Sequence, residues 1–188
     1  MKIGYQGIKG SNSERASRIL SEELKLNDIE LIPLTTSENV VKELKLKNID
    51  YGVMAIENTI GGPVLETRKA LLDVNVSVLE EVVLEIHHCL FKKSGVNVKN
   101  IKNIASHIQA LIQCKKNIEK LFPNCKIIET EDTSIAAKYL KEGILSDNTA
   151  VICSKGAGDM YNLELVKENI EDSSNNYTTF GIYKLIQE

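Results

Sequence analysis

The chain has 188 residues, of which 43% are apolar and 26% are charged, and its formal net charge is −3 at pH 7. A chain of this length and composition can bury a core unaided, as one large domain or two small lobes, so a disordered or disulfide-dependent protein is not expected. Its lysines are scattered over predicted helix faces, which speaks against a nucleic-acid partner, because phosphate binding needs clustered Lys and Arg.

The cysteines and histidines indicate neither a disulfide framework nor a metal site. The cysteines are far apart, form no CxxC pair and are predicted to be reduced thiols: Cys89, Cys114, Cys125 and Cys153. The histidines show no ligand spacing, so we expect no metal. The chain begins directly as a strand without a signal peptide, and no apolar run approaches the ~20 residues of a membrane helix. We therefore expect a cytoplasmic protein with no membrane partner.

The first half of the chain alternates strands with amphipathic helices. Its elements are expected at residues 2–6 (strand), 13–25 (helix), 29–34 (strand), 37–48 (helix), 51–57 (strand) and 63–73 (helix). Ser13 is expected to cap the first helix, and Pro63 to occupy the first turn of the third. This order predicts an α/β layer architecture with parallel strands.

The second half repeats the theme after a long strand at residues 76–91, which is long enough to leave one lobe and enter another. Further elements are expected at residues 102–107 (strand), 109–122 (helix), 125–131 (strand), 132–143 (helix), 148–154 (strand), 154–163 (short helix) and 177–188 (closing strand). The closing strand is expected to return to the first lobe.

Five polar loops each follow a strand and precede a helix: GIKGSNS, ENTIGG, ASHIQ, EDTS and CSKGAG. In open α/β sheets ligands bind at that edge, where helix N-termini present free N–H groups suited to carboxylates. Any one of these loops could equally be an ordinary turn whose Ser, Thr or Asn only caps a helix. All five on one edge favour a ligand site.

Six ordered blocks resemble the prephenate dehydratase family. They are YQGIKGSNSERA, IENTIGGPV, IHHCLF, SHIQALIQC, DTSIAA and NNYTTF, which is similar to the family's N-x-TRF signature. The resemblance implies a periplasmic-binding-protein-like (type II) fold with two α/β lobes around a cleft. We expect lobe 1 at about residues 1–80 plus 175–188 and lobe 2 at about 81–174, without the C-terminal ACT regulatory domain that family members commonly add.

The resemblance also implies an activity: conversion of prephenate to phenylpyruvate, water and carbon dioxide, toward phenylalanine, with no cofactor. The family's catalytic threonine corresponds to Thr178, which would donate a hydrogen bond or proton to the departing oxygen. Thr178 alone could equally be an ordinary strand threonine. An isolated domain of this type often pairs, so a homodimer is among the assemblies that the resemblance allows.

Other positions carry over from the family as substrate-binding candidates. These are Ser13, Asn58, Thr59, Ser106, His107, Gln109 and Asn176, with Phe180 in the pocket wall. Several of them could instead cap helices. His88 matches a family histidine, and we interpret it as structural.

The main departure from the family is Thr179, which stands where the signature carries arginine. Threonine cannot clamp a carboxylate with two charged hydrogen bonds, and Lys155 could replace that charge. Two alternatives therefore stay open: a prephenate decarboxylase that does not aromatise the ring, and a non-catalytic module that binds small carboxylates. We also expect Asn176 and Thr178 to face the cleft and Tyr177 and Thr179 the other side.

Overall fold

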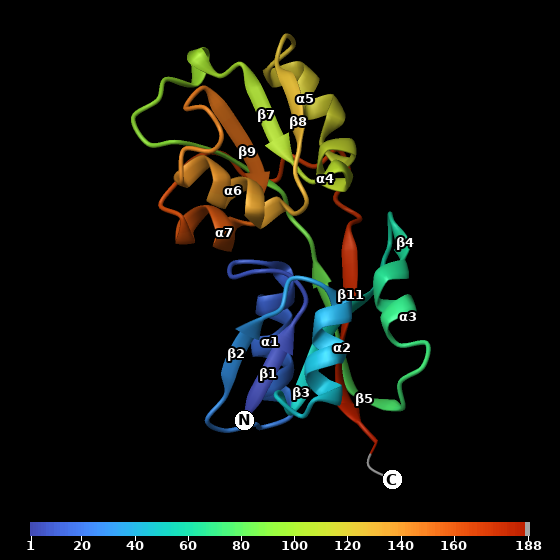
Figure 1. Ribbon diagram of the computed structural model, residues 1–188. Coiled ribbons are helices and arrows are strands. Elements are labelled where there is room, and N and C mark those ends of the chain that lie inside the picture. The colour runs from blue at the N-terminus through green and yellow to red at the C-terminus, as the bar shows by residue number, and fades with distance from the viewer. Residues whose placement is uncertain (187–188) are drawn as a thin grey trace. The chain divides into compact units, whose positions relative to one another are not determined.

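The computed structural model describes residues 1–186 as two compact units joined by two crossings of the chain (Figure 1). The first unit holds Met1–Ile86 and the segment that starts at Asn175, and the second holds His87–Ser174. The chain changes units after Ile86 and not near residue 80, because the strand that spans residue 80 belongs to the first unit over its whole length.

The elements of the first unit alternate along the chain as predicted. They are β1 (Lys2–Tyr5), α1 (Asn12–Glu23), β2 (Glu30–Pro33), α2 (Ser37–Lys45), β3 (Tyr51–Asn58), β4 (Gly62–Pro63), α3 (Leu65–Ala70), β5 (Val76–Glu85) and β11 (Tyr177–Leu185).

The sheet of the first unit has the order β2-β1-β3-β11-β5, with β4 beside β3. Strand β1 is parallel to β2 and β3, whereas β11 runs antiparallel to both β3 and β5. The closing strand therefore returns to the first unit, as predicted, and lies between two strands of the first half of the chain (Figure 1). Residues 187 and 188, expected to end this strand, lie outside the described residues.

Apolar side chains cover both faces of this sheet. Val53 of β3 packs with Ala16 and Leu20 of α1, whereas its neighbour Met54 packs with Val40 of α2 on the other face. Successive strand residues point to opposite faces, so the continuous apolar run of β3 is explained by burial on both sides.

The second unit is again α/β. Its elements are β6 (Cys89–Lys92), η1 (Val98–Asn100), β7 (Asn103–Ser106), α4 (Ile108–Gln113), α5 (Lys115–Leu121), β8 (Lys126–Glu129), α6 (Thr133–Lys141), β9 (Thr149–Cys153), α7 (Lys155–Met160) and β10 (Glu164–Lys167). The sheet order is β10-β6-β9-β7-β8, with β7 parallel to β8 and β9 and with β6 antiparallel to β9 and β10.

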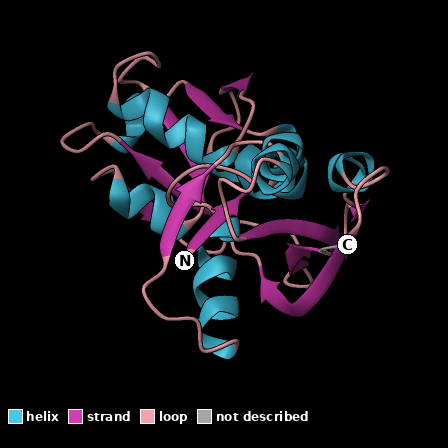
Figure 2. Ribbon diagram, turned by 60° about the horizontal axis from the view of Figure 1, so that its bottom comes forward, coloured by secondary structure: helices cyan, strands magenta, loops and turns pink. Residues whose placement is uncertain are grey.

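Helices also pack on both faces of the second sheet. Figure 2 shows the helices, strands and loops of the chain from a second direction. Val151 of β9 packs with Leu140 of α6, and its neighbour Ile152 packs with Leu111 of α4. Helix α7 approaches β6 so closely that a Cβ on Gly158 would lie 2.2 Å from the Phe91 ring. A side chain at this position would displace the buried Phe91 ring, and the helix itself begins after the N-cap Ser154.

Two predicted helix starts are wrong. The N-cap of α1 is Ser11, whose Oγ accepts a hydrogen bond from the Glu14 backbone N–H at 3.3 Å, so Ser13 lies inside the first turn. The Glu14 carboxylate in turn accepts from Gly10 N–H, which secures the earlier start. Pro63 lies in β4, opposite Glu57 of β3, and α3 begins only at Leu65.

Tertiary contacts also divide elements that the sequence presents as continuous. The predicted strand at 76–91 becomes β5 and β6, and the predicted helix at 109–122 becomes α4 and α5, with a break at Cys114. Strand β10 was not predicted. Within residues 1–186, no helix is both long and apolar enough to cross a lipid bilayer.

Candidate active site

The polar residues of the first unit gather where β3 ends and β11 begins. These strands are antiparallel, and Thr178 of β11 lies directly opposite Asn58, the last residue of β3. Strand β1 is parallel to β3, so the loop that leads into α1 emerges at the same edge of the sheet. This edge therefore unites polar residues that are more than a hundred positions apart in the sequence.

Asn58 is the centre of this cluster. Its Nδ2 lies 2.8 Å from Asn176 Oδ1, 3.0 Å from the Tyr177 carbonyl oxygen and 2.9 Å from Thr178 Oγ1. Its Oδ1 accepts hydrogen bonds from the backbone N–H groups of Ile60 and Gly61. The side chain of Asn58 thus fixes the loop after β3 and the start of β11 at the same time.

The Thr178 hydroxyl is held in a defined orientation. Its oxygen accepts from Asn58, and the residue is 8% exposed. No hydrogen-bond acceptor for its hydroxyl hydrogen occurs among the described residues. Because the amide approaches the oxygen lone pair, the hydroxyl hydrogen points elsewhere and can be donated to a bound molecule. A hydroxyl that is free to donate can act on a departing oxygen.

The other two candidates at this edge serve the geometry of β11. Thr59 Oγ1 donates to the Asn175 carbonyl and accepts from the Tyr177 N–H, so its hydroxyl joins the loop to the strand. Asn176 is 1% exposed, and its amide oxygen accepts from Asn58. Their roles as substrate ligands stay predictions.

Ser13 and Phe180 lie in different surroundings. Ser13 occupies the first turn of α1, and its Oγ would be 3.9 Å from a Cβ on Gly7, at the loop that leaves β1. Phe180 shares the face of β11 that Thr178 occupies, but it is buried with Ile3 and Tyr5 in the core of the unit. Its place in a pocket wall stays a prediction.

In the second unit, three candidates follow β7. Ser106 is fully buried, and its Oγ donates to the Ile152 carbonyl at 2.6 Å, which ties β7 to β9. His107 is the N-cap of α4, with its Nδ1 accepting from the Gln109 N–H at 3.3 Å. Gln109 is exposed at the first turn of that helix. Ser106 and His107 thus make hydrogen bonds within their own unit, and the Gln109 side chain lies at the surface.

Lys155 is the first residue of α7, directly after β9. Because β9 is parallel to β7, Lys155 and His107 emerge at the same edge of the second sheet. The Lys155 ammonium forms an ion pair with Glu168, and the hydrogen bond to that carboxylate raises the pKa of Lys155. The cation is thus present at the expected edge, with a carboxylate as its partner.

Thr179 lies on the opposite face of β11 from Thr178. It is directly opposite Glu57 of β3 and Val83 of β5. Directly opposed residues in an antiparallel pair have neighbouring side chains on the same face. An arginine at this position would therefore have a glutamate as its cross-strand neighbour.

A cluster that the sequence did not indicate lies where the chain crosses between units. The Glu171 carboxylate contacts His87 Nδ1 at 2.8 Å and accepts from the His88 N–H at 2.9 Å. His88 Nε2 lies 2.7 Å from Gln113 Oε1, at the end of α4. Burial is the main reason why the pKa of His88 is lowered. His88 thus has the structural environment that we expected.

Comparison with known proteins decides the family. The model of the family described as Prephenate dehydratase matches residues 3–185. The chain belongs to the prephenate dehydratase family. A curated relative, arogenate dehydratase/prephenate dehydratase 1 of Arabidopsis thaliana, is 33% identical over 97% of this chain and 44% of its own length. The chain spans between 41% and 48% of the length of the first curated relatives that it matches.

Solved structures agree with the family at the level of the fold. The prephenate dehydratase of Arthrobacter aurescens, solved in complex with L-Phe, superposes with a TM-score of 0.87 at 22% identity, over 100% of this chain and 61% of that one. A periplasmic substrate-binding protein of an ABC transporter from Coxiella burnetii gives 0.56 at 12% identity, over 98% and 84%. The predicted periplasmic-binding-protein-like α/β fold is therefore confirmed.

No group of three or more His, Cys, Asp or Glu side chains that could hold a metal ion occurs within residues 1–186. The candidate residues at the two sheet edges carry amides, hydroxyls, one imidazole and one ammonium group. Such groups suit the recognition of a carboxylate and of a leaving hydroxyl better than the coordination of a metal.

Proposed function

We propose that this chain is the catalytic domain of a prephenate dehydratase, converting prephenate to phenylpyruvate, water and carbon dioxide. The observation that carries the proposal is the hydrogen bond between Asn58 and Thr178 in a chain of this family. It orients a hydroxyl whose hydrogen can be given to the departing oxygen of the substrate.

The chemistry follows from the bonds that change. The bond between the ring and its carboxylate breaks, and its electron pair enters the ring as carbon dioxide leaves. The bond between the ring and its hydroxyl breaks at the opposite position, and the departing oxygen takes one proton to become water. Much of the driving force is the aromaticity of the product, so one well-placed donor is a sufficient chemical contribution.

Thr178 is the residue that we assign to this donor role. As negative charge develops, the Asn58 amide stabilises Thr178 Oγ1, which makes the transfer of its hydrogen easier. The two substrate carboxylates need partners as well, and Lys155, Gln109, His107 and Ser13 are the proposed contacts.

The proposal includes reaction without a cofactor and a location in the cytoplasm. The four cysteines are free, and three of them are buried, which supports a reducing compartment. A chelator is expected to leave activity unchanged. Pairing of two copies is a further part of the proposal, and sedimentation velocity tests it.

The decisive experiment mixes the purified protein with prephenate and follows phenylpyruvate by its absorbance in alkali and carbon dioxide by trapping. Equal amounts of both products support the proposal. Carbon dioxide without phenylpyruvate would indicate the decarboxylase alternative, and calorimetric binding without turnover would indicate a binding module. Arogenate belongs in a parallel reaction that measures phenylalanine, because a relative carries both substrate names.

A further inference from the structure

The second unit has a cavity of about 550 Å³ at the end of its sheet that is opposite to the candidate site. Ile101 and Lys102 come directly before β7, and Cys125 comes directly before β8, so this cavity lies at the amino ends of the parallel strands. Ser106 and His107 lie at the carboxyl end of β7. A molecule bound here would therefore be separate from the proposed substrate contacts.

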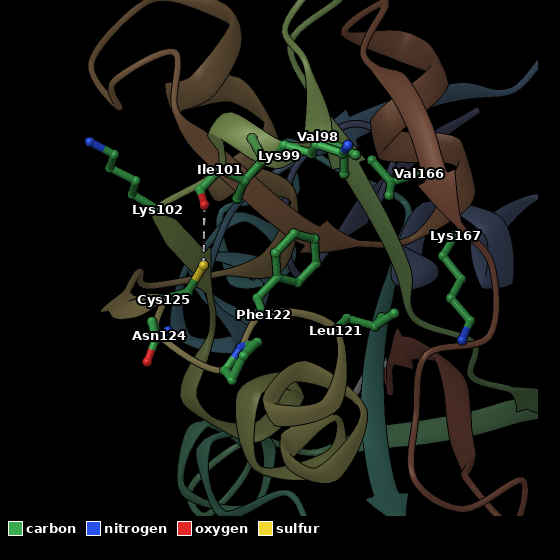
Figure 3. Close-up of a pocket in the computed structure, with 11 residues that line it drawn as sticks. Val98, Lys99, Ile101, Lys102, Leu121, Phe122, Asn124, Cys125, Val166 and Lys167 are labelled. Atoms are coloured by element: carbon green, nitrogen blue, oxygen red, sulfur yellow. Dashed lines mark hydrogen bonds between the residues drawn. The ribbon is translucent and has the colours of Figure 1, made fainter.

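The floor of the cavity is apolar. Figure 3 shows the Phe122 ring near the centre of the view, with Val166 and Leu121 beside it. Phe122 and Val166 pack against the core of the unit, so they form a fixed surface. An exposed concave surface of this composition is suited to the ring or branched chain of a small ligand.

The charged side chains around this floor all have the same sign. Lys99, Lys102 and Lys167 line the cavity, and no acidic residue does. None of the three forms an ion pair within residues 1–186, whereas Lys92, Lys93 and Lys155 of the same unit are all paired with carboxylates. Unpaired ammonium groups beside an apolar surface complement a ligand that is both apolar and anionic.

We propose that this cavity binds a small carboxylate with an aromatic or branched apolar body. The body would lie on Phe122, and the carboxylate would contact Lys167, with Lys99 adding to the positive charge of the cavity. Lys102 extends away from the other lining residues and has no such role (Figure 3). This proposal does not depend on the proposed reaction, because neither the cavity nor its test involves turnover.

Cys125 makes the proposal measurable. It lines the cavity, its Sγ lies 3.5 Å from the Ile101 carbonyl, and it is half-buried, whereas the other three cysteines are buried. A maleimide should therefore modify Cys125 first, as mass spectrometry of the digested protein can verify. The Cys125→Ser variant, which should lack this modification, confirms the assignment.

The probe is 3-phenylpropionate, and its neutral amide is the control. With about 11 non-hydrogen atoms, such a fragment should bind with a dissociation constant on the order of 1 mM. We expect it to slow the modification of Cys125 and the amide to slow it much less. Equal protection by the amide would show that the charge has no role. If inorganic phosphate protects Cys125 as well as the probe does, the apolar floor has no role in binding.

Two charge reversals then test the geometry. Lys167→Glu and Lys102→Glu change the net charge equally, so any long-range effect on the anion is the same in both. Each variant is compared with itself, with and without the probe, because a nearby charge also changes the reactivity of the thiol. Lys167→Glu should weaken binding roughly fivefold and Lys102→Glu much less. Equal weakening in both variants, or no protection of Cys125 in the native protein, would overturn the proposal.

Discussion

Asn58 and Thr178 face each other across β3 and β11, and the side-chain amide of Asn58 donates to the hydroxyl oxygen of Thr178 at 2.9 Å. The two residues are 120 positions apart in the sequence, and the amide is in turn fixed by the loop that follows β3. The orientation of one hydroxyl thus depends on the pairing of the last strand with the third.

Replacing Thr178 by valine should lower kcat for prephenate by about 100-fold or more and leave KM nearly unchanged. Valine keeps the shape but has no hydrogen to donate, and this donation matters mainly in the transition state. Thr179→Val is the matched control, because it changes the same group on the other face of the strand. A Thr178→Val enzyme with normal kcat and a raised KM would make Thr178 a binding residue.

Replacing Asn58 by aspartate should lower both kcat and stability. The carboxylate keeps an acceptor for the Ile60 and Gly61 N–H groups but removes every hydrogen that Asn58 donates. We expect a loss of about 1–3 kcal/mol in the free energy of unfolding, measured by urea denaturation, and a clear fall in kcat. Asn39→Asp on α2 is the control for added charge. Unchanged kcat would show that the amide does not serve the hydroxyl.

Lys155→Met should raise KM for prephenate with little effect on kcat. The partner Glu168 does not prevent this role, because the ion pair is exposed to solvent and contributes little, so a substrate carboxylate can displace Glu168. The rise should diminish at high salt. Lys141→Met, on the exposed surface of α6, is the control. A rise in KM of the same size in both variants would show that Lys155 does not bind a substrate carboxylate.

Introducing the family's arginine at position 179 should stabilise the fold slightly and leave KM within about twofold. The new side chain has Glu57 as its cross-strand neighbour, and such opposite-charge pairs contribute about 0.2–1 kcal/mol. The gain should disappear when Glu57→Gln is combined with Thr179→Arg. If KM falls severalfold instead, the arginine reaches the substrate and the native site lacks that cation.

Stability should decrease as the pH falls below about 6.5. Burial lowers the pKa of His88 in the folded protein below its ordinary value of 6.5, so the unfolded chain takes up a proton first. Stability from this residue is complete above 6.5 and is lost as the pH falls from there toward the folded pKa. Urea unfolding at pH 7 and pH 5 measures the slope. His88→Gln should make the free energy of unfolding less dependent on pH. An unchanged dependence would show that other groups cause it.

Regular patterns in the sequence predicted most of the fold. The apolar run of β3 and the amphipathic faces of α1 and α2 are local signals, and they gave the correct elements in the correct order. The elements that were predicted wrongly, or not at all, depend on contacts with residues far away in the sequence. Helices α4 and α5 are separate because the Asp172 carboxylate caps the N–H groups of Lys116 and Asn117 from more than 50 positions away. Strand β10 exists because β6 offers it an edge.

The candidate site was predictable to a similar degree. Family blocks indicated Thr178, Asn58 and Asn176, and the structure brings these three together. Residue identity could not show that the hydroxyls of Thr59 and Ser106 are committed to backbone carbonyls. It also could not show that Lys155 has Glu168 as its partner, because that contact depends on how α7 and the segment after β10 pack.

The position of β11 within its sheet has a consequence for how the protein is made. The strand lies between β3 and β5, which are synthesised before the whole second unit, yet it is synthesised after that unit. During translation the whole second unit is synthesised before β11. Until β11 is added, the facing edges of β3 and β5 have no strand between them. Thr178 enters with the strand that closes this gap. A chain that stops before residue 177 therefore exposes two strand edges that can pair with other strands, and it lacks Thr178, the proposed donor.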